Sequence, residues 1–214
     1  MQNKHYQSFV QNLAQDALFF GFLCLVLAVY RSAFLFLFRD TLSDATTWQQ
    51  IALTLWYGFR ISLKTAGALV LPSFVFATLV ETAYSKWPGF RVRWYWACAV
   101  LVVLSFLFQT RIPYYHEFHN AFSPFIFNTF NDDVGAIVST SIEEYHALGR
   151  AVVGLGCAVL WCVACRYWFK GLTTPLARPL LRVRRPWVAV TLMLVVAGVI
   201  CDGWLTVNVV GTWV

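Results

Sequence analysis

Charged residues are scarce in this chain of 214 residues. They make up 12% of the sequence, against about 25% in soluble domains, while hydrophobic residues reach 59%. The apolar residues gather in repeated runs of about 20, the length that crosses a hydrocarbon layer of about 30 Å. The lack of charge argues against a soluble domain and predicts one all-α, polytopic membrane domain over residues 1–214.

Acidic residues are also few, with 10 Asp and Glu against 16 Lys and Arg. The net charge of +6 is compatible with nucleic-acid binding, but the Lys and Arg residues fall in short connections between apolar runs. That placement is typical of topology signals and of contact with anionic lipids. We therefore expect membrane lipids, and no nucleic acid, as partners.

Active-site motifs are missing as well. The sequence has no G-x-S-x-G, P-loop, dinucleotide fingerprint or two-carboxylate arrangement, so no catalytic residue and no cofactor is assigned to it. Cys162 and Cys165 lie in mid-span, without the polar context of a redox or zinc site. His116 and His119 have H-x-x-H spacing, but an amphipathic aromatic pattern accounts for this region, so no metal site is predicted.

Five apolar runs are predicted to form a five-helix transmembrane bundle. They cover about residues 17–38, 61–80, 94–108, 151–169 and 187–207. Residues 51–59 are expected to form a separate, interfacial or tilted piece, and Pro72 is expected to kink the second span. Gly154, Gly156 and Ala158 give the fourth span a small-residue side suited to close helix packing.

The segment 111–149, between the third and fourth spans, carries several carboxylates among its aromatic residues. Its rings recur at helical spacing, which predicts amphipathic helices lying at the membrane interface. The rings expected at the interface are Tyr114, Tyr115, Phe118 and Phe122. Because this segment is acidic on balance, whereas the loops around Trp87 and at 166–185 are basic, the positive-inside rule puts it outside. The N-terminus is then inside and the C-terminus outside.

Three cations lie within the apolar stretches 17–38 and 51–80: Arg31, Arg60 and Lys64. A cation within a span costs ~2.5–3.5 kcal/mol on insertion scales unless it reaches the interface or finds a partner. Asp202 is the main acidic candidate within the spans. Two interpretations stay open: the side chains snorkel to the outer interface, or they recognise the phosphate of an anionic phospholipid.

Several short motifs resemble the N-terminal membrane region of the lipoteichoic acid synthase-like phosphoglycerol transferases, in the alkaline phosphatase/sulfatase superfamily. The motifs are Tyr30-Arg31-Ser32, Gly58-Phe59-Arg60, Leu69-Val70-Leu71-Pro72, Tyr114-Tyr115, Glu117-Phe118, Asp132-Asp133 and Ile142 to Tyr145. Five spans followed by an outer domain is also that family's arrangement. One departure is Ser62, which stands where the family often has an acid shortly after the arginine.

The resemblance implies a domain in the bacterial inner membrane that anchors and orients lipid for a phosphoglycerol or phosphoethanolamine transferase. The family's extracytoplasmic hydrolase-like domain, with its Thr or Ser nucleophile and a divalent metal such as manganese, is not in this sequence. The chain is thus expected to contain no catalytic residues of its own. The alternative is a small membrane scaffold or transport-related subunit that works through helix packing.

The predicted topology is tested by a reporter fused behind Val214. We expect an alkaline phosphatase fusion to be active, because that enzyme folds only outside the cytoplasm, and a fluorescent protein that matures only in the cytoplasm to stay dark. The opposite pair of results would overturn the assigned sidedness.

Overall fold

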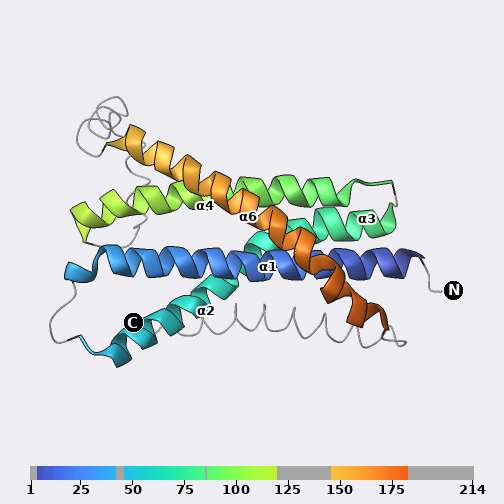
Figure 1. The fold of residues 1–214 in the computed structure, drawn as a ribbon, viewed down its shortest axis with the longest axis horizontal. Coiled ribbons are helices and arrows are strands. Elements are labelled where there is room, and N and C mark those ends of the chain that lie inside the picture. The colour runs from blue at the N-terminus through green and yellow to red at the C-terminus, as the bar shows by residue number, and fades with distance from the viewer. Residues whose placement is uncertain (1–3, 42–45, 85, 120–145, 183–214) are drawn as a thin grey trace. The chain divides into compact units, whose positions relative to one another are not determined.

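The computed structural model describes residues 4–41, 46–84, 86–119 and 146–182, and these ranges form helices and no strand (Figure 1). Four of the described helical segments are long and apolar enough to cross a membrane. They are Ser8–Leu37, Trp48–Ala83, Gly89–Phe118 and Ala147–Leu172. The all-α class is confirmed for the described residues, and four of the predicted apolar runs overlap with these segments. The predicted span 187–207 lies outside the described residues.

Helix α1 (Lys4–Leu37) begins well before the predicted start of the first span at residue 17. The polar residues at 4–16 lie within the helix, and two of them, Asn12 and Asp16, are buried. No proline or glycine interrupts the helix before Gly21. A short 3-10 turn, η1 (Arg39–Thr41), follows the helix, and the Thr41 hydroxyl donates to the Phe38 carbonyl at 2.7 Å.

Helix α2 (Trp48–Ser73) continues into a π-helix, η2 (Phe74–Leu79), and then into α3 (Val80–Ala83). The Gln50 side chain accepts a hydrogen bond from the Thr47 N–H at 3.0 Å, which caps the start of α2. The predicted division of this stretch near residue 60 is wrong, because α2 runs through it without a break. The irregularity lies instead directly after Pro72, where the π-helix begins.

Two tryptophan side chains bind backbone carbonyls on either side of Pro72. The Trp96 indole donates to the Leu69 carbonyl at 2.8 Å, and the Trp87 indole donates to the Phe76 carbonyl at 3.0 Å. A proline inside a helix leaves a carbonyl without its usual partner, and a π-turn shifts the pattern further. Side-chain donors at this point therefore tie the irregular stretch to helix α4 (Gly89–Phe118) and to the turn before it.

The chain divides into two compact units, residues 97–164 and the remainder. In the larger unit α1 packs against α2, η2 and α3 (Figure 1). The part of α6 (Ala147–Arg182) that belongs to this unit also packs on α1. Trp168 donates to the Leu18 carbonyl at 3.2 Å, and the Phe19 and Phe169 ring centroids lie 6.3 Å apart.

The smaller unit contains the later part of α4 and the first part of α6. Gly154 and Ala158 are buried, and a side chain at Gly154 would lie 3.3 Å from Gln109. Gly156 is exposed and has nothing within 4 Å of a built Cβ. The predicted small-residue side thus holds for Gly154 and Ala158, which are four residues apart, and not for Gly156.

The turn between α3 and α4 should not tolerate a side chain at Gly89. A Cβ there would lie 2.1 Å from the Glu81 Oε2 and 2.8 Å from the Ala77 carbonyl oxygen, and that backbone carbonyl cannot move aside cheaply. We expect Gly89→Ala to lower the free energy of unfolding by about 1–3 kcal/mol, the usual cost of overpacking.

Thermal unfolding of the purified protein in detergent would measure this effect. Gly21→Ala is the matched control, because Gly21 is in a helix with nothing within 4 Å of a built Cβ. The control should leave the melting temperature unchanged or raise it, since alanine favours a helix interior over glycine. Equal melting temperatures for Gly89→Ala and the wild type would contradict the steric argument.

Candidate functional site

A carboxylate and a guanidinium are buried together in the larger unit. The Arg93 Nε of α4 lies 2.8 Å from the Asp16 Oδ1 of α1, and the two side chains are 1% and 4% exposed. Arg93 is the largest of the fully buried side chains among the described residues. A buried ion pair persists only where further hydrogen bonds satisfy both ions, because each ion loses its hydration. The surrounding residues supply those bonds.

Both ions of the pair are bonded to neutral polar groups. The Asp16 carboxylate accepts hydrogen bonds from the Ser73 hydroxyl, at 2.8 Å, and from the Thr78 hydroxyl. The remaining N–H groups of Arg93 donate to the Gln15 side chain, to the Thr78 hydroxyl at 2.7 Å and to the Asn12 backbone carbonyl at 3.3 Å. We name these six residues the polar cluster. They are Asn12, Gln15, Asp16, Ser73, Thr78 and Arg93.

The π-helix explains how the α2–η2 stretch contributes two hydroxyls to one carboxylate. Ser73 and Thr78 are five residues apart, which in an α-helix would turn their side chains about 140° away from each other. The i to i+5 repeat of a π-helix brings residues at this spacing to the same side. Residues 74–79 form such a π-helix, so both hydroxyls reach Asp16. Pro72 precedes it and cannot donate a backbone hydrogen bond.

The polar cluster joins three helices rather than forming an open site. It takes Asn12, Gln15 and Asp16 from α1, two hydroxyls from the α2–η2 stretch, and Arg93 from α4. Its arginine is nearly inaccessible, so its chemistry is structural: it fixes which faces of the helices meet. Two buried polar atoms in the described chain lack a hydrogen-bond partner, the Asn12 Nδ2 in the cluster and the Glu81 Oε2 beside Gly89.

Sequence reasoning missed this cluster, although one signal was present. Gln15 and Asp16 follow Asn12 by three and by four positions, a spacing that puts all three residues on one face of a helix. Asp16 lies just before the predicted first span at 17–38, and Arg93 lies just before the predicted third span at 94–108, so neither residue falls inside a predicted span. An acid in the first turns of an apolar helix and an arginine at the start of another were the available indication of a pair.

The Arg31 guanidinium lies directly over Gly58 of α2. A Cβ built on Gly58 would be 1.3 Å from the Arg31 Nη1, so the arginine occupies the space that a side chain would take. Gly58 and Ser62, one turn later, are buried, and the Ser62 hydroxyl donates to the Gly58 carbonyl at 3.0 Å. Arg31 is therefore held at the contact between α1 and α2, rather than projecting alone from one helix.

Arg60 and Lys64 lie on α2 within two turns of Gly58, but on another side of the helix. Arg60 is exposed and Lys64 is half-buried. The structure thus brings the three predicted cations to about the same height along α2 and does not join them into one pocket. We call Arg31, Arg60 and Lys64 the cationic level.

The polar cluster and the cationic level lie far apart along the same two helices. At about 1.5 Å per residue, Asp16 and Arg31 are separated by about 22 Å on α1, and Ser73 and Gly58 by the same distance on α2. A hydrocarbon layer is about 30 Å thick. In a membrane the cluster and the cationic level therefore fall toward opposite leaflets.

The predicted interfacial aromatics lie in a continuous helix. Tyr114, Tyr115 and Phe118 belong to α4, which passes through Pro113 and ends at Phe118, so the third helix does not end near 108. The Tyr114 and Phe118 ring centroids are 4.8 Å apart, and Phe118 is 63% exposed. Phe122 lies outside the described residues. Residues 111–118 of the predicted interfacial segment 111–149 are thus the last part of α4 and not a separate helix.

Metal ligands do not gather in the part of the chain that the structure describes. No group of three or more His, Cys, Asp or Glu side chains there is placed to hold an ion. His116 and His119 lie at and just beyond the end of α4, and Asp132 and Asp133 fall outside the described ranges.

Comparison of the chain with protein-family models, with curated proteins and with solved structures finds no match. What can be said about function therefore comes from the residues and their geometry.

The Asp16–Arg93 pair predicts an asymmetry between single and double variants. Asp16→Ala leaves a buried arginine without its carboxylate, and we expect it to cost about 3–5 kcal/mol of unfolding free energy. Asp16→Ala combined with Arg93→Met removes both charges and should cost less than Asp16→Ala alone.

The measurement is unfolding in mixed micelles with increasing denaturing detergent. Asp40→Ala is the matched control, because Asp40 pairs with Arg39 at 3.5 Å on the surface, where the two side chains are 89% and 64% exposed. That control should change stability very little. A double variant less stable than Asp16→Ala alone would contradict the role given to the buried charge.

Proposed function

We propose that this chain is a membrane domain that anchors and orients anionic phospholipid for a lipoteichoic acid synthase-like phosphoglycerol transferase, or a phosphoethanolamine-transferring relative, at the outer face of the bacterial inner membrane. The observation that carries the proposal is the cationic level. It consists of Arg31, which is held between α1 and α2 at Gly58, and of two further cations on α2 within two turns of Gly58.

The position of Arg31 supports a role in recognition. Its guanidinium rests on Gly58 and is half-buried, so part of its freedom is already lost before a ligand binds. An arginine oriented in this way presents its planar N–H groups in a defined direction, which suits bidentate binding to phosphate. Gly58 leaves the space that the guanidinium occupies, because the side chain of any larger residue would push the guanidinium away.

Arg60 and Lys64 support the same proposal in a different way. They are four residues apart, so they lie on the same side of α2 and their like charges repel. A phosphate headgroup close to both would relieve that repulsion and would lower the cost of keeping cations beside the hydrocarbon layer. The distance of about 22 Å from the polar cluster fits a position at one headgroup region.

Catalysis in this proposal belongs to a hydrolase-like domain in cis or in trans, with a Thr or Ser nucleophile and a divalent metal such as manganese. Tyr114, Tyr115 and Phe118, at the end of α4, would lie near the side of the membrane where that domain acts. The reading frame after Val214, or a neighbouring gene, is the direct test of this part. A hydrolase-like domain there supports the proposal.

A second candidate function is a membrane scaffold or transport-related subunit. The π-helix after Pro72 and the buried polar cluster favour it, because interrupted helices and buried polar groups within spans are typical of transporters. The two candidates differ in what the cations do. A scaffold or transport subunit does not require Arg31 and Arg60 to bind lipid phosphate.

Lipid retention separates these possibilities. We expect Arg31→Leu and Arg60→Leu to insert normally, but to retain several-fold less phosphatidylglycerol than the wild type after purification in mild detergent, because each removes a phosphate-binding cation. Native mass spectrometry would count the bound lipids, with phosphatidylcholine as the uncharged competitor.

Lys86→Leu is the control variant. It removes an exposed cation from the turn before α4, away from the cationic level. It should leave the lipids at the cationic level in place. Equal retention of phosphatidylglycerol by Arg31→Leu, Arg60→Leu and the wild type would mean that these side chains only snorkel to the interface.

A further inference from the structure

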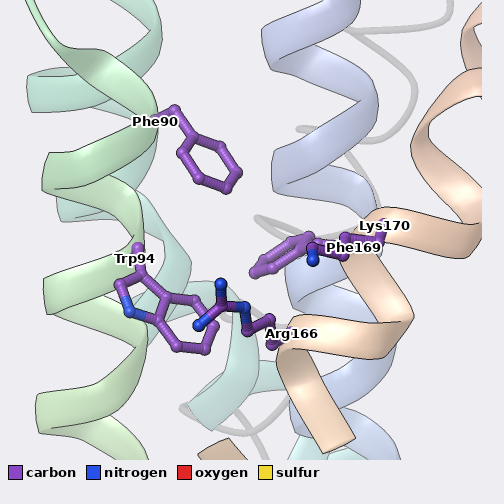
Figure 2. Close-up of a pocket in the computed structure, with 5 residues that line it drawn as sticks. All are labelled: Phe90, Trp94, Arg166, Phe169 and Lys170. Carbon is purple, nitrogen blue, oxygen red and sulfur yellow. The ribbon is translucent and has the colours of Figure 1, made fainter. Parts of the chain in front are cut away.

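A cavity of about 210 Å³ lies between the beginning of α4 and the later part of α6 (Figure 2). Its lining is Phe90, Trp94, Arg166, Phe169 and Lys170. All five residues belong to the larger compact unit. The cavity is smaller than the ~300–1,000 Å³ pockets that hold drug-sized ligands, which suits a small headgroup. Three aromatic rings and two cations make up its wall.

Helical spacing brings these side chains together. Phe90 and Trp94 are four residues apart on α4, and Arg166 and Lys170 are four apart on α6. Figure 2 shows the Arg166 guanidinium directed toward the Trp94 indole, and the Phe169 ring extends from α6 toward the same space. Arg93, next to Trp94 in sequence, points instead to the polar cluster, where Asp16 binds it.

The α6 side of the pocket is fixed in place by α1. Phe169 is only 4% exposed, and its ring centroid lies 6.3 Å from that of Phe19. Trp168 binds the Leu18 carbonyl and packs against Phe22, with the ring centroids 5.9 Å apart. Arg166 and Lys170 therefore extend from a part of α6 that is held against α1 by Trp168 and Phe169.

The charges of the pocket have no counter-ion in the described part of the chain. Arg166 and Lys170 are exposed, and neither makes an ion pair or a hydrogen bond among the described residues. The nearby buried carboxylate, Asp16, is already occupied by Arg93, Ser73 and Thr78. Two like charges four residues apart on one helix are unfavourable without an anion between them.

We infer that this pocket binds the phosphate of an anionic phospholipid headgroup, with Arg166 and Lys170 as the phosphate ligands and Phe90 and Trp94 as the wall for the glycerol and upper acyl chain. The pocket lies level with Leu18 and Phe19 of α1, about 20 Å from Arg31 along that helix. It therefore serves the leaflet opposite the cationic level. This second site does not depend on the proposed transferase role.

Membrane lipid is the occupant that the geometry favours over a free anion. The cations lie beside aromatic rings, and Phe90 is 53% exposed, so an apolar surface stays open next to the two charges. Aromatic residues and cations together are characteristic of the headgroup region of a bilayer. A free phosphate would use the two cations and leave the rings without a function.

The test compares the double variant Arg166→Leu/Lys170→Leu with the wild type in native mass spectrometry, after exchange into micelles that contain equal phosphatidylglycerol and phosphatidylcholine. We expect the double variant to lose one tightly bound phosphatidylglycerol, with at least a several-fold fall in its occupancy. Arg166→Lys/Lys170→Arg keeps both charges and should retain the lipid. Arg91→Leu, which removes an exposed cation one residue from Phe90, is the matched control and should also retain it.

A photo-crosslinker at Phe90 provides a second measurement that does not remove a charge. Benzoylphenylalanine at this position should crosslink to phosphatidylglycerol in preference to phosphatidylcholine, and the preference should disappear in the double variant. The variants Arg31→Leu and Arg60→Leu should leave this crosslink unchanged, so failure of the cationic level to bind lipid is distinguishable from failure of this pocket.

Three results would overturn the inference. One is equal phosphatidylglycerol occupancy in the wild type and in Arg166→Leu/Lys170→Leu. Another is an equal loss from Arg91→Leu, which would show a general charge effect and no defined site. The third is full displacement of the lipid by excess inorganic phosphate, which would assign the pocket to a free anion instead of a lipid headgroup.

Discussion

The buried pair between Asp16 and Arg93 is the interaction on which the arrangement of the larger unit depends. Each ion loses several kcal/mol of hydration on burial, and the attraction between them compensates only if their remaining donors and acceptors are also satisfied. Ser73, Thr78, Gln15 and the Asn12 carbonyl meet that requirement. Because these groups come from separate helices, the pair is satisfied only when the helices lie in one register. The polar cluster thus selects an arrangement that apolar packing alone would leave less defined.

The local irregularity of α2 follows from the same requirement. A regular α-helix would direct Ser73 and Thr78 to different sides, and Asp16 would then keep only one hydroxyl partner. The π-helix after Pro72 corrects this, and the Trp96 and Trp87 indoles bind carbonyls on either side of the proline. The irregular backbone is therefore surrounded by hydrogen bonds, as it must be inside a membrane, where water cannot satisfy it.

A fixed helix pair places charge at two heights. The contact between Arg31 and Gly58 lies about 22 Å from the polar cluster along the helices. This distance is a large part of the thickness of a hydrocarbon layer, which is about 30 Å. The aromatic pocket at Trp94 and Arg166 lies near the height of the cluster itself. Both proposed lipid sites consequently rest on the same buried pair, since Arg93 and Trp94 are adjacent on α4 and Asp16 and Arg31 share α1.

By itself, the sequence determined that the described chain is helical and where its four apolar helices approximately lie, because the length of a hydrophobic run and the scarcity of charge are local properties of the sequence. It also singled out Arg31, Arg60 and Lys64 as unusual. Only the tertiary structure decided which polar residues are partners. Arg93 and Asp16 are 77 positions apart, and no periodicity connects them. Nor could hydropathy predict that Asp16 continues a helix or that the turn after Pro72 widens, since both depend on bonds formed only when α1, α2 and α4 meet.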